Sequence, residues 1–541
     1  MRAKGAAMAE RALIEALRAR AAGGVEEAAG PRAADLTLRL ARSGDLPALA
    51  AELTGPRAMA LATVVATDET ATPEGDFKVR YLFEPTVAGG ADRFVTLLVS
   101  VDPAHPEVPS LTRAIPAANW HEREMRDLFG IVPAGHPDPR PLVVHDGWPA
   151  GCFPLRKSFD PAQRLPVVPA PEFPHLVAEG EGLFEIPVGP IHAGIIEPGH
   201  FRFGGVGELV LHLEARLFYT HRGIEKAAEG RSPTEVLALA ERICGACSLS
   251  HQVAYCEAIE ALAGVRTSRR AQLIRSTLLE LERLYNHVGD IANLCAGASL
   301  QLGVHQGGVL KERLQELNAK VAGHRYLFGV ATPGGVRRDI GPDDQRIVRS
   351  ELAAIEAQLR GYLRALVESE SFMDRLTGTG VLSRSVAEEL GAVGVAARAS
   401  GVRRDVRAER SYSAYPGDLE PVVRSEGDVR ARMLVRADEA IASFGLVRGF
   451  LDELAQLPSG DLAAPVGALA ADSWAVGIVE SPRGENVHWV MTGPAGEIRR
   501  YRVRSASYNW ALVPYAVTGD LLPDFPLINK SFELCYACLD R

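Results

Sequence analysis

The fold prediction starts from residues 241–251, which read Glu-Arg-Ile-Cys-Gly-Ala-Cys-Ser-Leu-Ser-His. This stretch holds the first of two Cys-x-x-Cys pairs, Cys244 and Cys247, and the last residues of the printed sequence hold the second, Cys535 and Cys538. A two-residue spacing lets both sulfurs of a pair turn onto one metal ion from a tight loop or a helix start. Together the pairs offer four thiolates.

Spacing alone leaves three kinds of site open: a structural zinc site, a pair of redox dithiols, or a catalytic transition-metal site. Four-cysteine zinc sites usually draw both pairs from one small module, about 15 to 20 residues apart. Here almost a whole helical domain separates the pairs, so we expect a site buried between the core and the closing tail. Soft thiolates suit nickel and iron as well as zinc.

The composition excludes several other classes of protein. The chain has 541 residues, 47% of them hydrophobic, and a net charge of −9, so no basic excess suggests nucleic acid as a partner. No apolar run reaches the roughly 20 residues that cross a bilayer, and the N-terminus lacks a signal-peptide core. The seven cysteines are too few for a secreted disulfide framework. We therefore expect the chain to stay on the cytoplasmic side.

The C-terminal half reads as mainly helical. Apolar residues recur every three or four positions over residues 274–291, 352–366 and 441–454, which predicts three helices of a bundle core. Over the last 60 residues turn signals replace this period, and residues 487–491 and 501–503 are strand-like. We expect the chain to close on short strands and loops.

The N-terminal half reads as a small α+β domain. Residues from about 9 to 55 predict short helices, and residues 77–83 and 94–101 predict strands. Five prolines between residues 161 and 174 indicate a linker, because proline removes backbone donors. The prediction is an α+β fold with a domain over residues 1–160, a linker over 161–180 and a mainly helical domain over 181–541.

Residues 241–251 match the R-x-C-G-x-C-x-x-x-H motif of NiFe hydrogenase large subunits, and the second pair resembles their C-x-x-C-x-x-(H/R) ending. Further matches cover nearly all of residues 181–541, namely 189–192, 197–202, 221–226, 333–336 and 481–484. Some of these also resemble the 49-kDa subunit of complex I, which lacks the cysteines. The mixture resembles energy-converting (group 4) NiFe hydrogenases of the formate hydrogenlyase type.

The N-terminal half agrees with this resemblance. Residues 120–131, with 135–138 and 154–157, look like the signature of the 30-kDa complex I subunit. A fusion of that domain to a hydrogenase-type large subunit is the arrangement of the formate hydrogenlyase type. We assign the charged helix at residues 120–131 to docking rather than chemistry, and its alternative interpretation is a solvated face.

The resemblance implies a metal centre and its chemistry. All four cysteines would bind nickel, and Cys247 and Cys538 would also bridge to an iron that carries cyanide and carbon monoxide. The reaction would be the reversible interconversion of dihydrogen with protons and electrons, in which a nearby base accepts a proton. Cys256 and Cys295 fall on apolar helical faces and are expected to be buried as small hydrophobic residues.

Three further residues match catalytic positions of the family. Glu197 would shuttle protons, and Arg483 would hold its guanidinium over the metals and cyanides. His251 would donate a hydrogen bond to Cys247. Without this context, Glu197 and Arg483 would be interpreted as solvated turn residues, and His251 as a capping or core histidine.

Two other positions match weaker features of the family pattern. Ser507 would bind an iron cyanide, and Glu225 matches a carboxylate near a possible magnesium site. The common C-terminal histidine partner of that site is Arg541 here, which argues against magnesium. Glu533 and Leu534 replace the usual Asp-Pro before Cys535, so a loop-stiffening proline is lost. The sequence ends at Arg541, where many relatives carry a tail that is removed after nickel insertion, so we expect a chain that is processed or made without one.

No iron-sulfur ligand set remains once the four cysteines are used. The resemblance therefore implies a small subunit with a 4Fe-4S cluster (complex I 20-kDa-like), a ferredoxin-like 4Fe-4S subunit, and membrane subunits of a complex I-like arm. The expected location is peripheral, on the cytoplasmic face of a bacterial inner membrane. Two rival functions stay open: a nickel-free, complex I-like electron-transfer or quinone-site subunit, and a zinc-stapled scaffold subunit. The electron donor, whether formate, carbon monoxide or ferredoxin, is left open as well.

Overall fold

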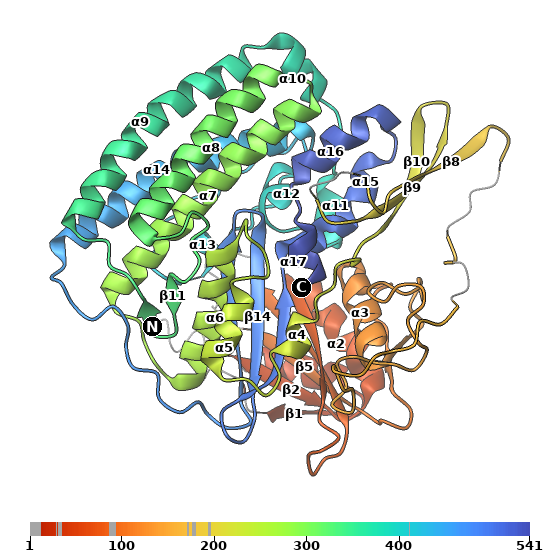
Figure 1. Ribbon diagram of the computed structural model, residues 1–541. Helices are drawn as coiled ribbons and strands as arrows, with labels where there is room; N and C mark the ends of the chain where they lie inside the picture. The colour runs from red at the N-terminus through yellow and green to blue at the C-terminus, as the bar shows by residue number, and fades with distance from the viewer. Residues whose placement is uncertain are drawn as a thin grey trace. The chain divides into compact units, whose positions relative to one another are not determined.

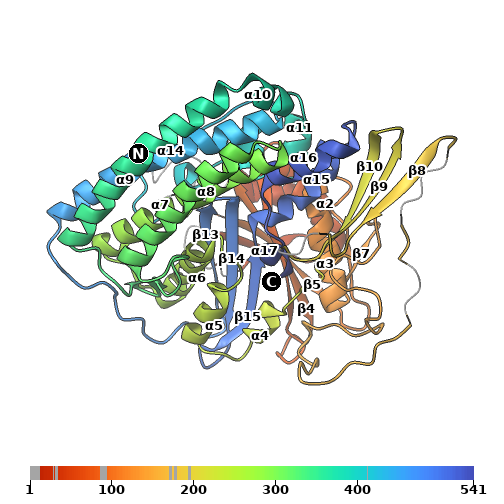
Figure 2. The ribbon, with the colours of Figure 1, turned by 45° about the horizontal axis from the view of Figure 1, so that its top comes forward.

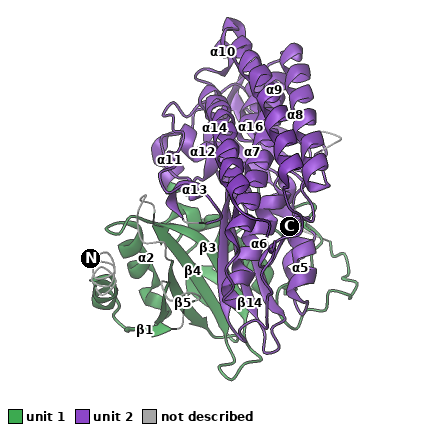
Figure 3. Cartoon of the chain, turned by 90° about the vertical axis from the view of Figure 1, so that its left-hand side faces the viewer, with its two compact units in different colours: residues 1–175, 217–221, 389–391 green, residues 176–216, 222–388, 392–541 purple. Residues whose placement is uncertain are grey.

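The computed structural model describes residues 12–28, 30, 35–85, 94–169, 173–175, 180–192, 196–410 and 412–541. The chain divides into two compact units (Figure 3). Unit 1 comprises residues 1–175, 217–221 and 389–391, and unit 2 comprises residues 176–216, 222–388 and 392–541. Both units combine helices with mixed or antiparallel sheets, so the predicted α+β class is confirmed.

Unit 1 is built on a five-stranded sheet with the order β1-β2-β5-β4-β3. Its strands are β1 (Val25–Ala28), β2 (Leu36–Leu40), β3 (Met59–Asp68), β4 (Phe77–Pro85) and β5 (Val95–Val101). β2 and β5 run parallel, and the other neighbours run antiparallel. Helices α2 (Leu46–Thr54) and α3 (Asn119–Phe129) pack on this sheet. The short strands β6 (Glu107–Pro109) and β7 (Val132–Ala134) pair separately.

The prediction of short helices over residues 9–55 was wrong in part. Residues 12–20 and α2 are helical, but residues 25–28 and 36–40 are strands, and residues 9–11 lie outside the described part. In β2, Leu36, Leu38 and Leu40 alternate along the strand. This strand-like alternation of apolar residues spans only five residues. The surrounding alanine, leucine and arginine favour a helix, so the sequence pattern predicted one. The strands predicted near residues 77–83 and 94–101 are present as β4 and β5.

Most of the ionisable side chains of the charged helix α3 are buried, so little of the helix is exposed to solvent. The Glu122 carboxylate accepts hydrogen bonds from Ser110 Oγ at 2.5 Å and from the Leu111 N–H at 2.7 Å. The Asp127 carboxylate accepts from the N–H of Leu142 at 2.7 Å. These carboxylates anchor loops within unit 1. The interpretation of residues 120–131 as a solvated face is therefore wrong, and the docking role stays a prediction.

Unit 2 contains a bundle of four long helices: α7 (Arg269–Gly297), α8 (Gln301–Ala322), α9 (Pro342–Val367) and α14 (Val429–Gln456). Figures 1 and 2 show them side by side, and each helix packs on two of the others. The helices predicted over residues 274–291, 352–366 and 441–454 are confirmed as parts of α7, α9 and α14. No helix in the described part of the chain is long and apolar enough to span a membrane.

The sequence analysis missed helix α8, because glycine and polar residues near its start interrupt the apolar period. Gly307 is the clearest case: a β-carbon there would lie 2.6 Å from the Ala292 β-carbon and 2.9 Å from the Tyr362 hydroxyl. The glycine allows α7 and α9 to approach α8 closely. The reason for a glycine at this position is therefore visible only in the packed structure.

An antiparallel sheet of β13 (Trp474–Ser481), β14 (Gly484–Thr492) and β15 (Ile498–Arg504) carries helix α6 (Ser248–Ala263). The strands confirm the prediction for residues 487–491 and 501–503. The end of the chain differs from the expected strands and loops, because it forms the helices α15 (Val513–Val517), α16 (Phe525–Phe532) and α17 (Tyr536–Asp540). Figure 2 shows α17 beside β14 and β15.

The remaining elements of unit 2 are short. A second antiparallel sheet contains β8 (Leu183–Val188), β9 (His200–Val206) and β10 (Leu209–Arg216). The other elements are α4 (Ile224–Ala227), α5 (Pro233–Ala240), β11 (Ala331–Thr332), β12 (Gly335–Val336), α10 (Glu370–Leu376), α11 (Arg384–Glu389), α12 (Gly394–Ala399) and α13 (Val406–Glu409).

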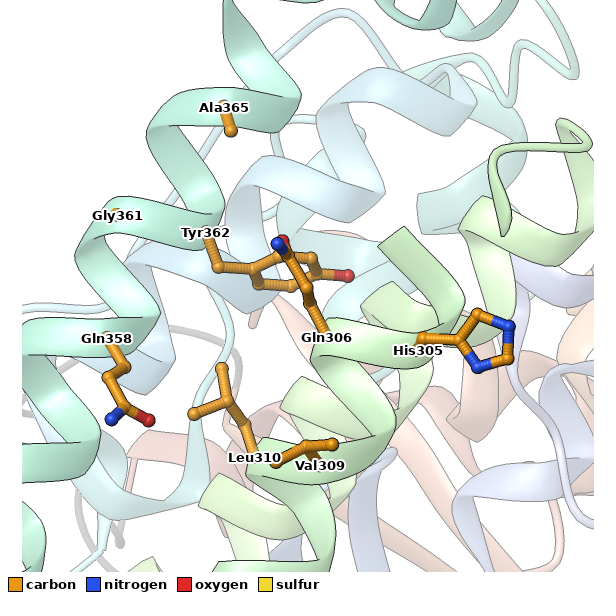
Figure 4. A pocket seen from close by; sticks show the side chains of 8 residues that line it. All are labelled: His305, Gln306, Val309, Leu310, Gln358, Gly361, Tyr362 and Ala365. Carbon is orange, nitrogen blue, oxygen red and sulfur yellow. The ribbon is translucent and has the colours of Figure 1, made fainter. Parts of the chain in front are cut away.

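A surface pocket of about 490 Å³ opens between α8 and α9 (Figure 4). Its lining includes His305 and Val309 from α8 and Gln358 and Tyr362 from α9. None of the cysteines predicted to bind metal belongs to this lining. The pocket is therefore separate from the predicted site.

Candidate metal centre

The first cysteine pair lies in the loop between α5 and α6, where Cys247 is the N-terminal cap residue of α6. The Cys244 sulfur accepts a hydrogen bond from the Ala246 N–H at 3.3 Å. Two side chains of α7 hold this loop, because Tyr285 Oη and Asn286 Nδ2 donate to the Ala246 carbonyl at 2.8 and 2.6 Å. The first pair is thus tied to the helix bundle.

The first turn of α6 is anchored by a carboxylate of the bundle. Glu282 on α7 accepts hydrogen bonds from the N–H groups of Leu249 and Ser250 at 2.7 and 3.0 Å. These groups have no partner inside the helix, so a buried acceptor is needed at this position. Burial raises the pKa of Glu282 to about 7, although these hydrogen bonds oppose the shift.

The second pair is held by two serines that come just after β15. Ser507 Oγ accepts from the Cys535 N–H at 3.1 Å, and Ser505 Oγ donates to the Cys538 carbonyl at 2.9 Å. Cys535 precedes α17 and Cys538 lies within it. The pair therefore has a defined position despite the loss of the proline before Cys535.

The structure brings all four cysteines together. The sulfurs of Cys244, Cys247 and Cys538 lie within 4.8 Å of one another, and the Cys247 and Cys538 sulfurs are 3.2 Å apart. Cys244 and Cys538 shift the pKa of the Cys535 thiol, so this thiol lies beside theirs. Cys244, Cys247 and Cys538 are buried, and Cys535 is half-buried. This donor set, drawn from residues almost 300 positions apart, suits a soft metal ion.

Neighbouring sulfurs change how readily Cys247 and Cys538 lose their protons. Hydrogen bonds with Cys244 and Cys538 lower the pKa of Cys247 to about 7, against the effect of burial. Burial and the neighbouring thiols raise the pKa of Cys538 above its ordinary value. One thiolate forms readily, whereas several buried thiolates together require a compensating cation.

Arg483, in the turn between β13 and β14, supplies one such cation. Its Nε donates to the Glu533 carbonyl at 2.9 Å, Nη1 to Asn286 Oδ1 at 2.5 Å, and Nη2 to Asp290 Oδ1 at 3.0 Å. Burial would lower the pKa of Arg483, but Asp290 and the sulfur of Cys535 raise it, so the guanidinium stays charged. The cation is fixed beside the cysteine cluster.

His251, on α6, also lies against the cluster, but on a different sulfur from the one expected. Its Nε2 lies 3.5 Å from Cys538 Sγ, whereas the expected partner was Cys247. The ring is oriented by a residue outside α6, because its Nδ1 lies 2.8 Å from Nε2 of His488 on β14.

Family models match three parts of the chain. The model for nickel-dependent hydrogenases matches residues 222–296, which include the first cysteine pair. The models for the 30-kDa and 49-kDa subunits of respiratory-chain NADH dehydrogenase match residues 41–164 and 309–472.

Curated relatives span most of the chain. Formate hydrogenlyase subunit 5 of Escherichia coli is 36% identical over 474 residues, covering 86% of this chain and 82% of the relative. The chain belongs to the energy-converting NiFe hydrogenase large subunits of the formate hydrogenlyase type. Hydrogenase-4 component G of Escherichia coli is 34% identical over 87% of this chain and 82% of its own length.

The chain is also similar to subunits of complex I and of a related respiratory enzyme. An NADH-quinone oxidoreductase subunit of Bacteroides thetaiotaomicron is 29% identical over 88% of this chain and 93% of its own length. A chain of an archaeal membrane-bound sulfane sulfur reductase complex superposes with a TM-score of 0.63 at 29% identity, covering 68% of this chain and all of that chain. The protein is a hydrogenase-type catalytic subunit, and it is an oxidoreductase.

Glu197, matched to the proton-shuttling position of this family, lies in the segment between β8 and β9 and is half-buried. Burial raises the pKa of the Tyr536 phenol, and the nearby Glu197 carboxylate contributes to the rise. Tyr536 stands between Cys535 and Cys538 in the sequence, so the charge of Glu197 acts on a residue within the second pair.

Glu225, the family's carboxylate near a magnesium ion, has a different environment from the one expected. Its carboxylate pairs with Arg500 Nη1 at 2.8 Å and with Nη1 of Arg502 and of Arg541 at 3.3 Å each. It also accepts from the Val503 N–H at 3.0 Å. A divalent cation would meet an excess of positive charge here. The residues present do not fit magnesium, and no step is assigned to it.

The sequence analysis missed several residues that shape the site. Three polar residues of α7 recur every four positions on a buried face, and this pattern could have identified them: Glu282, Asn286 and Asp290. Arg222 links the two pairs, because its Nη2 donates to the Ile243 carbonyl at 2.7 Å and to the Ala537 carbonyl at 2.9 Å. No local signal indicated that contact. Cys256 and Cys295 are buried within helices, as predicted.

Proposed function

We propose that this chain catalyses the reversible interconversion of dihydrogen with two protons and two electrons at a nickel-iron centre. The observation that carries the proposal is the convergence of four cysteines from two distant segments, with a buried guanidinium fixed beside them. When bound, the metal group supplies the polarisation of dihydrogen and accepts or donates its electrons. All the other roles belong to the residues of the chain.

The four cysteines would hold the metals as thiolates, which are soft, electron-rich ligands. The sulfurs of Cys247 and Cys538 are 3.2 Å apart, so both could bind the same metal group. Arg483 offsets the negative charge of the thiolates and of the cyanides assigned to iron, because it is a fixed cation that costs no reorganisation during turnover. Burial excludes water from the sulfurs and strengthens these interactions.

Proton transfer is assigned to Glu197, which is half-buried and whose charge acts on Tyr536 within the second pair. A half-buried carboxylate can accept a proton and release it to solvent. His251 donates its Nε2–H to Cys538 and thereby tunes that sulfur. A serine hydroxyl that accepts one hydrogen bond can donate another, so Ser507 can hold the Cys535 loop and also donate to a cyanide on iron.

Electrons leave through partner subunits in this proposal, because the described part of the chain holds one cysteine cluster, which the nickel-iron centre uses. The partners are a small subunit with a 4Fe-4S cluster, a ferredoxin-like 4Fe-4S subunit and the membrane subunits of a complex I-like arm. The relatives include a membrane-bound hydrogenase subunit of Pyrococcus furiosus, 31% identical over 66% of this chain. We propose a peripheral position on the cytoplasmic face of a bacterial inner membrane.

The test is the content of nickel, iron and zinc in the complex purified from its native host, together with its hydrogen evolution. We expect about one nickel per chain, as a four-thiolate site requires. The variant Cys538→Ser should lose nickel and activity. Cys256→Ser is the matched control, because Cys256 is equally buried but lies outside the cluster. Zinc in place of nickel would favour the zinc-stapled scaffold and contradict the proposal.

A nickel-free electron-transfer subunit is the second candidate, and the match of residues 309–472 to the 49-kDa subunit model favours it. Under this function the complex would contain neither nickel nor bound zinc, and electron transfer from its donor to its acceptor would survive Cys244→Ala. Loss of electron transfer and of nickel together in that variant would exclude this candidate.

A further inference from the structure

Behind Cys538, three further side chains form a continuous row of hydrogen bonds. Cys538 Sγ lies 3.5 Å from His251 Nε2, His251 Nδ1 lies 2.8 Å from His488 Nε2, and His488 Nδ1 lies 2.8 Å from the Tyr501 hydroxyl. His251, His488 and Tyr501 are fully buried. The cysteine ligands and the catalytic residues matched above leave His488 and Tyr501 without a role.

Three elements bring these side chains together. His488 pairs with Val503 and Val490 pairs with Tyr501, so His488 and Tyr501 are diagonal neighbours on one face of the β14–β15 ladder. Helix α6 packs on this sheet and directs His251 at His488. One turn further along α6, the ring of Tyr255 packs edge-on against Tyr501, with centroids 5.6 Å apart. The row is therefore held by packing on both sides.

A thiolate at Cys538 allows one arrangement of protons in this row. A metal-bound thiolate only accepts hydrogen bonds, so His251 has to carry its proton on Nε2 and leave Nδ1 as an acceptor. His488 then donates from Nε2 and accepts at Nδ1 from the Tyr501 hydroxyl. Burial lowers the pKa of His488 below its usual range and raises the pKa of Tyr501. Both groups are thus in the neutral form that this arrangement requires.

We propose that His488 and Tyr501 are positioning residues, which hold His251 in the tautomer and ring orientation that present its Nε2–H to the Cys538 sulfur. The inference rests on the proposed function, because it treats Cys538 as a metal-bound thiolate. A hydrogen bond to a bridging sulfur withdraws electron density from it. The row would therefore set how strongly Cys538 donates to the metals.

A purely structural role for His488 makes a different prediction, and two variants separate the roles. Glutamine at position 488 offers an amide N–H to His251 Nδ1 and a carbonyl to the Tyr501 hydroxyl, whereas leucine offers neither. If His488 positions His251, His488→Gln should retain the slowly exchanging Nε2–H of His251 and the wild-type affinity for Zn²⁺ far better than His488→Leu. If it only fills space, leucine should do as well as glutamine in this fully buried position.

The experiment uses the full-length chain labelled with ¹⁵N-histidine and loaded with Zn²⁺, which converts the cysteines to thiolates without paramagnetism. In the wild type we expect one His251 Nε2–H proton resonance that exchanges slowly with solvent. It should persist in His488→Gln, broaden in Tyr501→Phe and disappear in His488→Leu, with Zn²⁺ affinity in the leucine variant lowered roughly 10- to 100-fold. Tyr255→Phe is the control, because the Tyr255 hydroxyl donates to the Pro233 carbonyl outside the row, and its spectrum should match the wild type.

Two outcomes would overturn the inference: a slowly exchanging Nε2–H that survives His488→Leu, or equal loss of that signal in the glutamine and leucine variants. The result does not depend on which metal the native complex carries, because Zn²⁺ is supplied in every sample. A native complex without nickel would remove the proposed hydrogenase function, whereas loss of the distinction between glutamine and leucine would remove the positioning role.

Discussion

At the scale of single residues, Arg483 shows how the site combines charge with geometry. Its guanidinium donates hydrogen bonds in three directions, to the Glu533 carbonyl, to Asn286 and to Asp290. A planar fork of donors can hold that arrangement, and an ammonium group cannot. The charge of Arg483 therefore has one defined position relative to the cysteine sulfurs.

We predict that Arg483→Lys keeps the positive charge but lowers hydrogen turnover per nickel by roughly 10- to 100-fold, because lysine cannot satisfy all three acceptors. Turnover should be measured in the purified complex and divided by its nickel content. Arg242→Lys is the control, because Arg242 lies in the first cysteine motif but is largely exposed, and it should change turnover little. Wild-type turnover in Arg483→Lys would show that charge alone is sufficient.

At the scale of elements, the packing of α6 on β13 positions half of the site, because α6 begins at Ser248 and carries His251. The approach is so close that β13 has a glycine at the contact. A β-carbon on Gly477 would lie 1.9 Å from the Ala254 carbonyl oxygen. Any side chain at this position would push the helix away from the sheet, and the helix start would move with it.

We predict that Gly477→Ala lowers the free energy of unfolding by about 1–3 kcal/mol, the usual cost of overpacking a core, and also weakens metal binding. Chemical denaturation and metal affinity of the full-length chain measure the two effects. Gly445→Ala on α14 is the control, because no atom lies within 4 Å of its β-carbon position. That helix position should gain about 1 kcal/mol, as alanine generally does over glycine. Unchanged stability in Gly477→Ala would mean that α6 can shift without cost.

At the scale of the whole molecule, a buried network of charges joins elements that are far apart in the sequence. The Glu439 carboxylate of α14 pairs with His287 Nε2 of α7 at 2.8 Å and with Arg398 Nε of α12 at 2.7 Å. Arg398 Nη1 reaches Glu480 Oε1 of β13 at 2.8 Å. Each charge is compensated by another, so removing one partner would leave a buried charge alone.

This network predicts that the unfolding free energy of unit 2 falls in mild acid. Burial lowers the pKa of His287 to about 4, whereas an unfolded histidine titrates near 6.5. Between these values the unfolded chain binds a proton that the folded chain does not. The contribution of His287 to the free energy of unfolding is fully present above about pH 6.5. It is lost as pH falls towards 4, at about 1.4 kcal/mol per pH unit.

Denaturant unfolding of the full-length chain at pH 7.5, 6.0 and 5.0 measures this loss. In His287→Gln the amide can still donate to Glu439 but cannot take up a proton, so the dependence on pH should be shallower by up to one proton. Equal slopes for the wild type and the variant would mean that His287 is charged in the folded protein or that other groups dominate.

Motifs and short periods of apolar residues were sufficient to predict the family, the α+β class, three bundle helices and the four cysteines, because these signals are local in the sequence. It also indicated the burial of Cys256 and Cys295. It could not indicate that α8 is helical, because the glycines there are explained by neighbours on α7 and α9. The helix propensity of one segment takes no account of the other segments that pack on it.

The contacts between atoms at the site could be identified only in the folded chain. His251 faces Cys538 rather than Cys247, and His488 and Tyr501 line up behind it. Arginine side chains, including that of Arg541, surround Glu225 where a metal ion was considered. These contacts join residues up to some 300 positions apart, and they depend on strand register and on how helices pack. A difference of one residue in register would turn each side chain to the opposite face. Because β14 is buried along its whole length, no alternation of exposed and buried residues in it specifies that choice.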